Sequence, residues 1–161
     1  KMCESYNFQY GTNYKCIMPC NTYGPNDNFN LITSHFYPAL IMKMLHAKKR
    51  KKRSIEIWGN GKAKRELLYV DDLADACIYF MNKNSPNLIN IGTGKDKTIL
   101  NYANFLKTQI NYYPSVNFDL SKPNGTKRKV LDVSIAKKLG WIAKTSLKEG
   151  TVKTIKSLSF S

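Results

Sequence analysis

The chain contains two histidines, and one of them, His35, lies where an acid or a base could act on a bound molecule. It follows a turn-rich loop at residues 19–29, reading PCNTYGPNDNF, and it precedes a segment with helical periodicity. Imidazole has an ordinary pKa of about 6.5, so it donates and accepts protons near neutral pH. Taken alone, a single histidine at such a place is more often a surface or capping residue, and both interpretations stay open.

A second group of polar residues lies at residues 57–76, reading IWGNGKAKRELLYVDDLADA. Arg65 can bind a phosphate group through two parallel hydrogen bonds, or it can form a surface ion pair with Glu66. Trp58 can pack against a nucleotide or sugar, or it can be a core aromatic residue. An acidic pair, Asp71 and Asp72, follows an apolar strand, and one of the two is expected to cap the next helix.

The charge of the chain points to anionic partners. Its 161 residues are enough for one ordinary domain and include 26 basic and 11 acidic residues, for a net charge of +15. Nucleic acid, acidic lipid and phosphorylated small molecules all fit this charge. Six consecutive basic residues, Lys48 to Arg53, are predicted to form a solvated loop between a helix and a strand.

Cysteine and histidine spacing predicts no metal site. The four cysteines, Cys3, Cys16, Cys20 and Cys77, form no Cys-x-x-Cys pair. We expect them to be reduced, buried thiols of a cytoplasmic protein, because the apolar content is too high for a disulfide-dependent fold. No apolar run reaches the roughly 18 residues of a membrane span, so no membrane association is expected.

Apolar runs alternate with helical patterns, which predicts an α/β fold with parallel strands. Loops that follow the strands of such sheets are where ligands bind. Strands are predicted at residues 14–18, 55–58, 67–70, 88–91 and 116–120. Helices are predicted at residues 1–10, 35–47, 72–82, 99–110 and 133–139, and from residue 146 onward.

Several strings carry a family resemblance: MPCNTYGPNDNF, SHFYPALIMK, WGNGKAKRELLYVDDLADAC, NIGTGKDKTI and SKPNGTKRKVLDV. In this order and spacing they resemble the C-terminal half of the GDP-L-fucose synthase family, within the extended short-chain dehydrogenases/reductases. The resemblance implies a Rossmann domain that binds NADP(H) and a small α/β substrate-binding domain. It implies that residues 1–24 and 66–96 are the remaining Rossmann elements, whereas residues 25–65 and 97–161 form the substrate domain.

The same resemblance implies an activity. The complete enzyme would convert GDP-4-keto-6-deoxy-D-mannose to GDP-L-fucose by epimerisation and NADPH-dependent reduction. The resemblance also implies a Tyr-x-x-x-Lys pair as the acid and base of the redox step, and this pair would fall just before Lys1. We therefore expect a C-terminal portion that is inactive alone, a missing N-terminal half, and a homodimer as the full-length enzyme. Two alternatives stay open: another NAD(P)-dependent nucleotide-sugar epimerase or dehydratase, and a non-catalytic basic module that binds nucleic acid.

Site residues follow from the matched strings. The resemblance implies that His35 is the epimerisation acid and contacts the cofactor. Lys43 stands where the family typically carries Arg, and Asn124 replaces a family Asp. The remaining implied contacts are cofactor residues Pro19, Cys20, Asn21 and Thr22, and substrate residues Lys43, Trp58, Arg65, Asn124 and Lys129.

Overall fold

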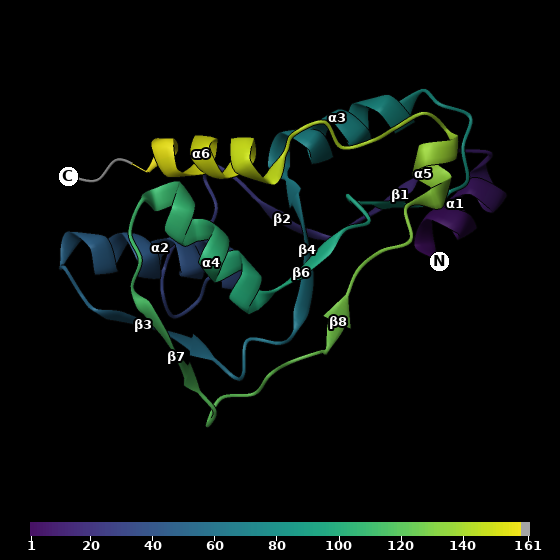
Figure 1. Ribbon diagram of the computed structural model, residues 1–161. Coiled ribbons are helices and arrows are strands. Elements are labelled where there is room, and N and C mark those ends of the chain that lie inside the picture. Colours follow the sequence, from purple (N-terminus) through teal and green to yellow (C-terminus); the bar gives the residue numbers. More distant parts are fainter. Residues whose placement is uncertain (159–161) are drawn as a thin grey trace.

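The structure is a computed structural model that describes residues 1–158. Figure 1 shows its helices and strands. The helices are α1 (Met2–Tyr10), α2 (Phe36–Lys49), α3 (Val70–Met81), α4 (Ile99–Ile110), α5 (Ser134–Lys138) and α6 (Leu147–Ser157). The strands are β1 (Cys16–Pro19), β2 (Asn21–Tyr23), β3 (Ser54–Trp58), β4 (Lys64–Tyr69), β5 (Leu88–Ile91), β6 (Asp96–Thr98), β7 (Ser115–Asp119) and β8 (Arg128–Lys129).

Most strand pairs are parallel, as predicted for this mixed α/β chain. β1 pairs with β5, β3 with β7, and β4 with both β2 and β8, all in parallel. β6 is antiparallel to β4. The fold is therefore Rossmann-like, and β4 is its central strand because it carries three neighbours.

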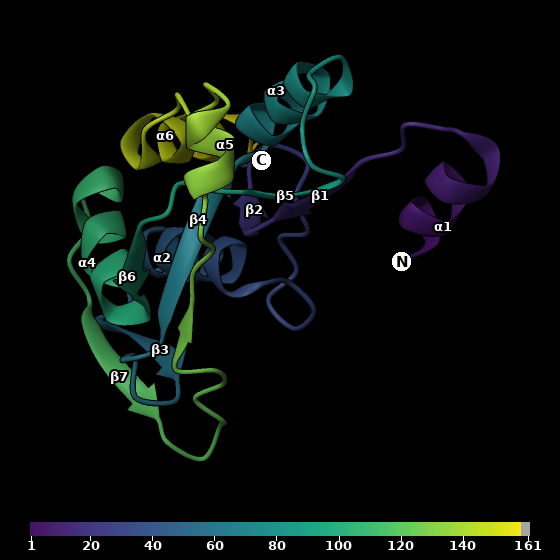
Figure 2. The same ribbon diagram turned by 90° about the vertical axis from the view of Figure 1, so that its right-hand side faces the viewer.

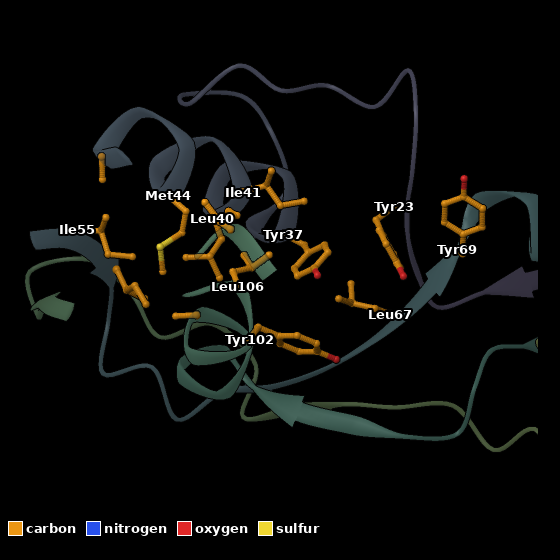
Figure 3. Packing of buried hydrophobic residues seen from close by; sticks show 14 residues of the cluster. Tyr23, Tyr37, Leu40, Ile41, Met44, Ile55, Leu67, Tyr69, Tyr102 and Leu106 are labelled. Carbon is orange, nitrogen blue, oxygen red and sulfur yellow. The ribbon is translucent and has the colours of Figure 1, made fainter. Parts of the chain in front are cut away.

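Two hydrophobic clusters meet at β4, whose side chains alternate between them. Leu67 and Tyr69 join the first cluster, which packs α2 against α4 and β3 (Figure 3). Leu68 faces the second cluster, where Phe80 of α3 and Trp141 are buried together with β5. β4 therefore contributes side chains to both clusters and fixes their positions relative to each other.

The basic tract is more ordered than predicted. α2 extends to Lys49, so the expectation of a solvated loop is wrong for the start of the tract. The helix ends in a cap in which Arg50 N donates to His46 O and Lys52 N donates to Ala47 O. Lys51 takes the left-handed conformation, with φ 51°, that such helix ends need.

Two other local predictions were wrong. Neither Asp71 nor Asp72 caps α3, since its N-cap is Tyr69 without a side-chain bond. The carboxylate of Asp72 instead accepts from Thr145 N at 3.0 Å and Thr145 Oγ1 at 3.1 Å, tying α3 to the segment before α6. All four cysteines were expected to be buried, but only Cys20 is; Cys3 and Cys16 are half-buried and Cys77 is exposed. The last three residues of the predicted final helix and substrate domain lie outside the described residues.

α1 lies apart from the other helices (Figure 2). None of its residues is buried, and Phe8 is 94% exposed. Gly11, with φ 62°, ends the helix as predicted. Among residues 1–158, no helix is long and apolar enough to cross a membrane.

Candidate functional site

Trp58 is a surface residue flanked by cations, so the core alternative is wrong. Its side chain is 51% exposed at the end of β3. The Nζ atoms of Lys43 and Lys122 each lie 5.7 Å from the centre of its ring. Lys43 Nζ also donates to Glu56 O at 2.9 Å, and burial lowers the pKa of this ammonium group.

Asn124 fastens the loop before β8 to the turn after β3. Its Oδ1 accepts from Asn60 N at 2.7 Å. A Cβ atom on Gly59, whose φ is 67°, would collide with the Asn124 side chain. The Gly-Asn-Gly turn is therefore shaped to receive this loop, which places Asn124 beside the end of β3.

Arg65 and Lys129 are neighbours on paired strands, at matched positions of β4 and β8. Arg65 Nη1 donates to Lys64 O at 2.8 Å and Thr126 O at 2.6 Å. Next to Lys129, Arg128 Nε donates to Asp96 Oδ2 at 2.6 Å, and this hydrogen bond lowers the pKa of Asp96. β8 is thereby held against β4 and β6.

The five predicted substrate residues form one feature, which we call the β3–β4 strip. It starts at α2, follows the turn between β3 and β4, and ends on β8. Its members are Lys43, Trp58, Arg65, Asn124 and Lys129. Beside its Trp58 end is a cavity of about 180 Å³ lined mainly by apolar side chains, among them Phe36, Leu40 and Ile57.

The predicted cofactor residues lie at the end of β1 and the start of β2. Pro19 is exposed at the carboxyl end of β1. Cys20 N donates to Ile91 O at 3.0 Å, and burial raises the pKa of the Cys20 thiol to about 12, so the thiol stays neutral. Asn21 Nδ2 donates to Glu66 O at 2.9 Å, and Thr22 is half-buried in β2.

His35 is the N-cap of α2, but its side chain makes no capping hydrogen bond. The ring is exposed, whereas its neighbours Ser34 and Phe36 both line the 180 Å³ cavity. Ser34 Oγ is buried without a hydrogen-bond partner among residues 1–158. His35 therefore stands next to a cavity with an unused polar group, and no hydrogen bond within residues 1–158 joins its ring to the Pro19–Thr22 segment.

Glu66 is the structural residue of the site that sequence reasoning missed. It is fully buried and makes no ion pair with Arg65 in residues 1–158, so the surface-pair alternative is wrong. Its Oε1 accepts from Gly94 N at 2.6 Å, and its Oε2 accepts from Leu131 N at 2.8 Å. The signal that could have revealed it was an acidic residue directly before the apolar run of β4, at Leu67–Tyr69.

We expect Glu66→Gln to lower the free energy of unfolding by about 1–3 kcal/mol, the typical cost of an unsatisfied buried group. An amide offers one acceptor oxygen, so its NH₂ group must face the N–H of Gly94 or Leu131. Denaturant unfolding measures the change. Glu56→Gln, an exposed glutamate on β3, is the matched control, and equal stability of the two variants would contradict this role.

The fold and the family comparison define the class of this chain. Residues 1–92 match the model of the NAD dependent epimerase/dehydratase family. The chain belongs to that family. Among the residues that the structure describes, no group of three or more potential metal ligands comes together.

Individual relatives have narrower names than the family model. The chain is 43% identical to the GDP-L-fucose synthase of Escherichia coli K12, with 96% of this chain and 51% of the relative covered. It is 42% identical to the probable GDP-L-fucose synthase 1 of rice, Oryza sativa subsp. japonica, with 97% and 48% covered. A solved GDP-L-fucose synthetase from Naegleria fowleri bound to NADP superposes with a TM-score of 0.87 at 25% identity, covering 97% of this chain and 51% of that one. The chain thus spans about half the length of the curated relatives it matches.

Proposed function

We propose that this chain is the C-terminal half of a GDP-L-fucose synthase, converting GDP-4-keto-6-deoxy-D-mannose to GDP-L-fucose. The observation that carries the proposal is the β3–β4 strip, in which Trp58 adjoins an apolar cavity and Arg65 adjoins Lys129. An aromatic ring beside a cavity suits a nucleobase, and adjacent cations suit a diphosphate. The relatives named as GDP-L-fucose synthases support the same substrate.

The strip suggests how the substrate would lie. The base would pack by Trp58 in the 180 Å³ cavity, and Arg65 and Lys129 would bind the diphosphate. Asn124 would accept a hydrogen bond from the sugar. Lys43 already lies over Trp58 and would add a positive charge near the base, without the two-pronged geometry of an arginine.

The proposed cofactor is NADP(H), which supplies a hydride for the reduction when bound. The exposed carboxyl end of β1 fits a ligand, because open α/β sheets bind ligands at such strand ends. Pro19, Cys20, Asn21 and Thr22 would hold its nicotinamide end. His35 would donate a proton to the ring carbon that is epimerised, next to the sugar ketone.

The domain division remains part of the proposal. Residues 1–24 and 66–96 would belong to the cofactor-binding domain, and residues 25–65 and 97–161 to the substrate domain. The complete enzyme would be a homodimer. The proposed compartment is the cytoplasm, where thiols such as the four free cysteines stay reduced.

We expect the chain alone to show no NADPH-dependent turnover, because the family resemblance implies that the Tyr-x-x-x-Lys pair lies before Lys1. A chimera that joins the N-terminal half of the Escherichia coli relative to Lys1 should oxidise NADPH in the presence of GDP-4-keto-6-deoxy-D-mannose. The absorbance of NADPH measures both reactions. Turnover by the chain alone, or a folded chimera that binds NADPH but does not consume it with this substrate, would contradict the proposal.

A different nucleotide-sugar epimerase or dehydratase is the second candidate. The observation that favours it is the pair of departures at Lys43 and Asn124, both within the β3–β4 strip. Offering the chimera GDP- and UDP-linked keto sugars side by side separates the two candidates, because the proposed enzyme should use the GDP-linked mannose derivative best.

A further inference from the structure

A second cavity, of about 560 Å³, is lined by the basic tract and lies beside the one at Trp58. Lys43 and His46 lie on one face of α2, and Arg50, the residue that caps this helix, follows at the same helical spacing. Lys52 and Arg53 complete the lining from the segment that leads to β3. Glu56 and Asn117, opposite each other on β3 and β7, also line it. We call it the cationic cavity.

Hydrogen bonds to backbone carbonyl groups fix the segment that supplies these cations. Tyr112 Oη donates to Lys52 O at 2.8 Å, and Ser115 N donates to Arg53 O at 2.9 Å. Together with the capped end of α2, these bonds hold both sides of the tract. The charges are therefore presented at defined places, unlike those of a loose basic tail.

The charges of the cationic cavity are unbalanced. Four lining residues are basic, Lys43, Arg50, Lys52 and Arg53, whereas Glu56 is the single acidic lining residue. None of these basic residues takes part in an ion pair within residues 1–158. Two arginines can each present a planar fork, the geometry that matches phosphate oxygens.

We propose that the cationic cavity binds a small oligophosphate, as an anion site separate from Arg65 and Lys129 of the β3–β4 strip. Its volume of about 560 Å³ lies within the range of small-molecule sites. No Phe, Tyr or Trp lines it, so it lacks the stacking surfaces that single-stranded nucleic acid uses. It shares Leu31, Lys43 and Glu56 with the 180 Å³ cavity, so an anion there would contact a residue of the proposed nucleotide site.

Calorimetric titration with inorganic tripolyphosphate tests the proposal on this chain, at about 150 mM salt to suppress distant charge effects. The double variant Arg50→Gln/Arg53→Gln should bind about 100-fold more weakly, since each arginine contributes charge-assisted hydrogen bonds. The matched control Lys51→Gln/Lys148→Gln removes the same charge from exposed lysines that do not line the cavity, and should weaken binding less than about threefold.

Three results would overturn the proposal: no binding by the parent chain, equal weakening in both double variants, or tighter binding of an oligouridine than of tripolyphosphate with the same dependence on Arg50 and Arg53. Arg53→Lys keeps the charge and loses the planar fork of the guanidinium, so it should weaken tripolyphosphate binding about tenfold. This single variant tests the proposal if the double variant does not fold. Circular dichroism confirms folding of each variant. No turnover is measured, so the result is independent of the proposed enzymatic function.

Discussion

His35→Gln in the complete enzyme should lower turnover by about 10²–10⁴-fold, the usual contribution of a positioned proton donor. Epimerisation must deliver a proton to the opposite face of an enolate carbon next to the ketone. His35 is exposed, makes no capping bond, and has both neighbours in the wall of the 180 Å³ cavity, so its ring is available for this step. The turnover number of the chimera with NADPH and the keto sugar measures the loss.

Solvent deuterium separates an acid from a structural residue at this position. The His35→Gln variant should incorporate deuterium into the sugar ring more slowly, because that exchange reports the epimerisation step itself. Gln keeps a hydrogen-bond donor, so the dissociation constant for NADPH is expected to change little. Exchange at the parental rate would show that His35 has a structural role.

Arg65→Ala should raise the Michaelis constant for the GDP-sugar by about 10–100-fold, since one charge-assisted hydrogen bond is typically worth 1.5–3 kcal/mol. The bonds of Arg65 to Lys64 O and Thr126 O both use Nη1, which leaves Nε and Nη2 for a diphosphate. The affinity for NADPH should fall much less. Steady-state kinetics with each substrate varied in turn measures the difference.

Arg128→Ala is the matched control for Arg65. Arg128 sits on the neighbouring strand, and its guanidinium is used by Asp96. Removing it deletes the same charge and breaks the pair with Asp96, so it should cost stability. It should leave the Michaelis constant for the GDP-sugar within about threefold, because the Arg128 guanidinium is already bound to Asp96. If the two variants bind the GDP-sugar equally well, Arg65 is not a diphosphate ligand.

Local patterns predicted the longer elements well. The helix expected at residues 99–110 matches α4 residue for residue, because its apolar positions are periodic and Thr98 caps it by accepting from Asn101 N. β2, β6 and β8 were missed, since strands of two or three residues carry no periodicity of their own. They exist because β4 offers them hydrogen-bonding edges.

The arrangement of the candidate site could not be predicted from the spacing of residues along the chain. Arg65, Asn124 and Lys129 were assigned through the family resemblance, and their proximity arises from the pairing of β4 with β8 and from the Asn124–Asn60 bond. Glu66 has partners 28 and 65 residues away in sequence. The cationic cavity likewise depends on β3 packing beside α2, which turns a basic run into part of a concave surface.

The configuration of the product tests the central claim most directly. The chimera would be incubated with GDP-4-keto-6-deoxy-D-mannose and NADPH, and the sugar nucleotide formed would be identified by proton NMR coupling constants. The account predicts GDP-L-fucose, with inversion at both carbons next to the ketone. A GDP-linked 6-deoxy sugar that keeps the starting configuration at either carbon, formed by a folded and NADPH-consuming chimera, would contradict it.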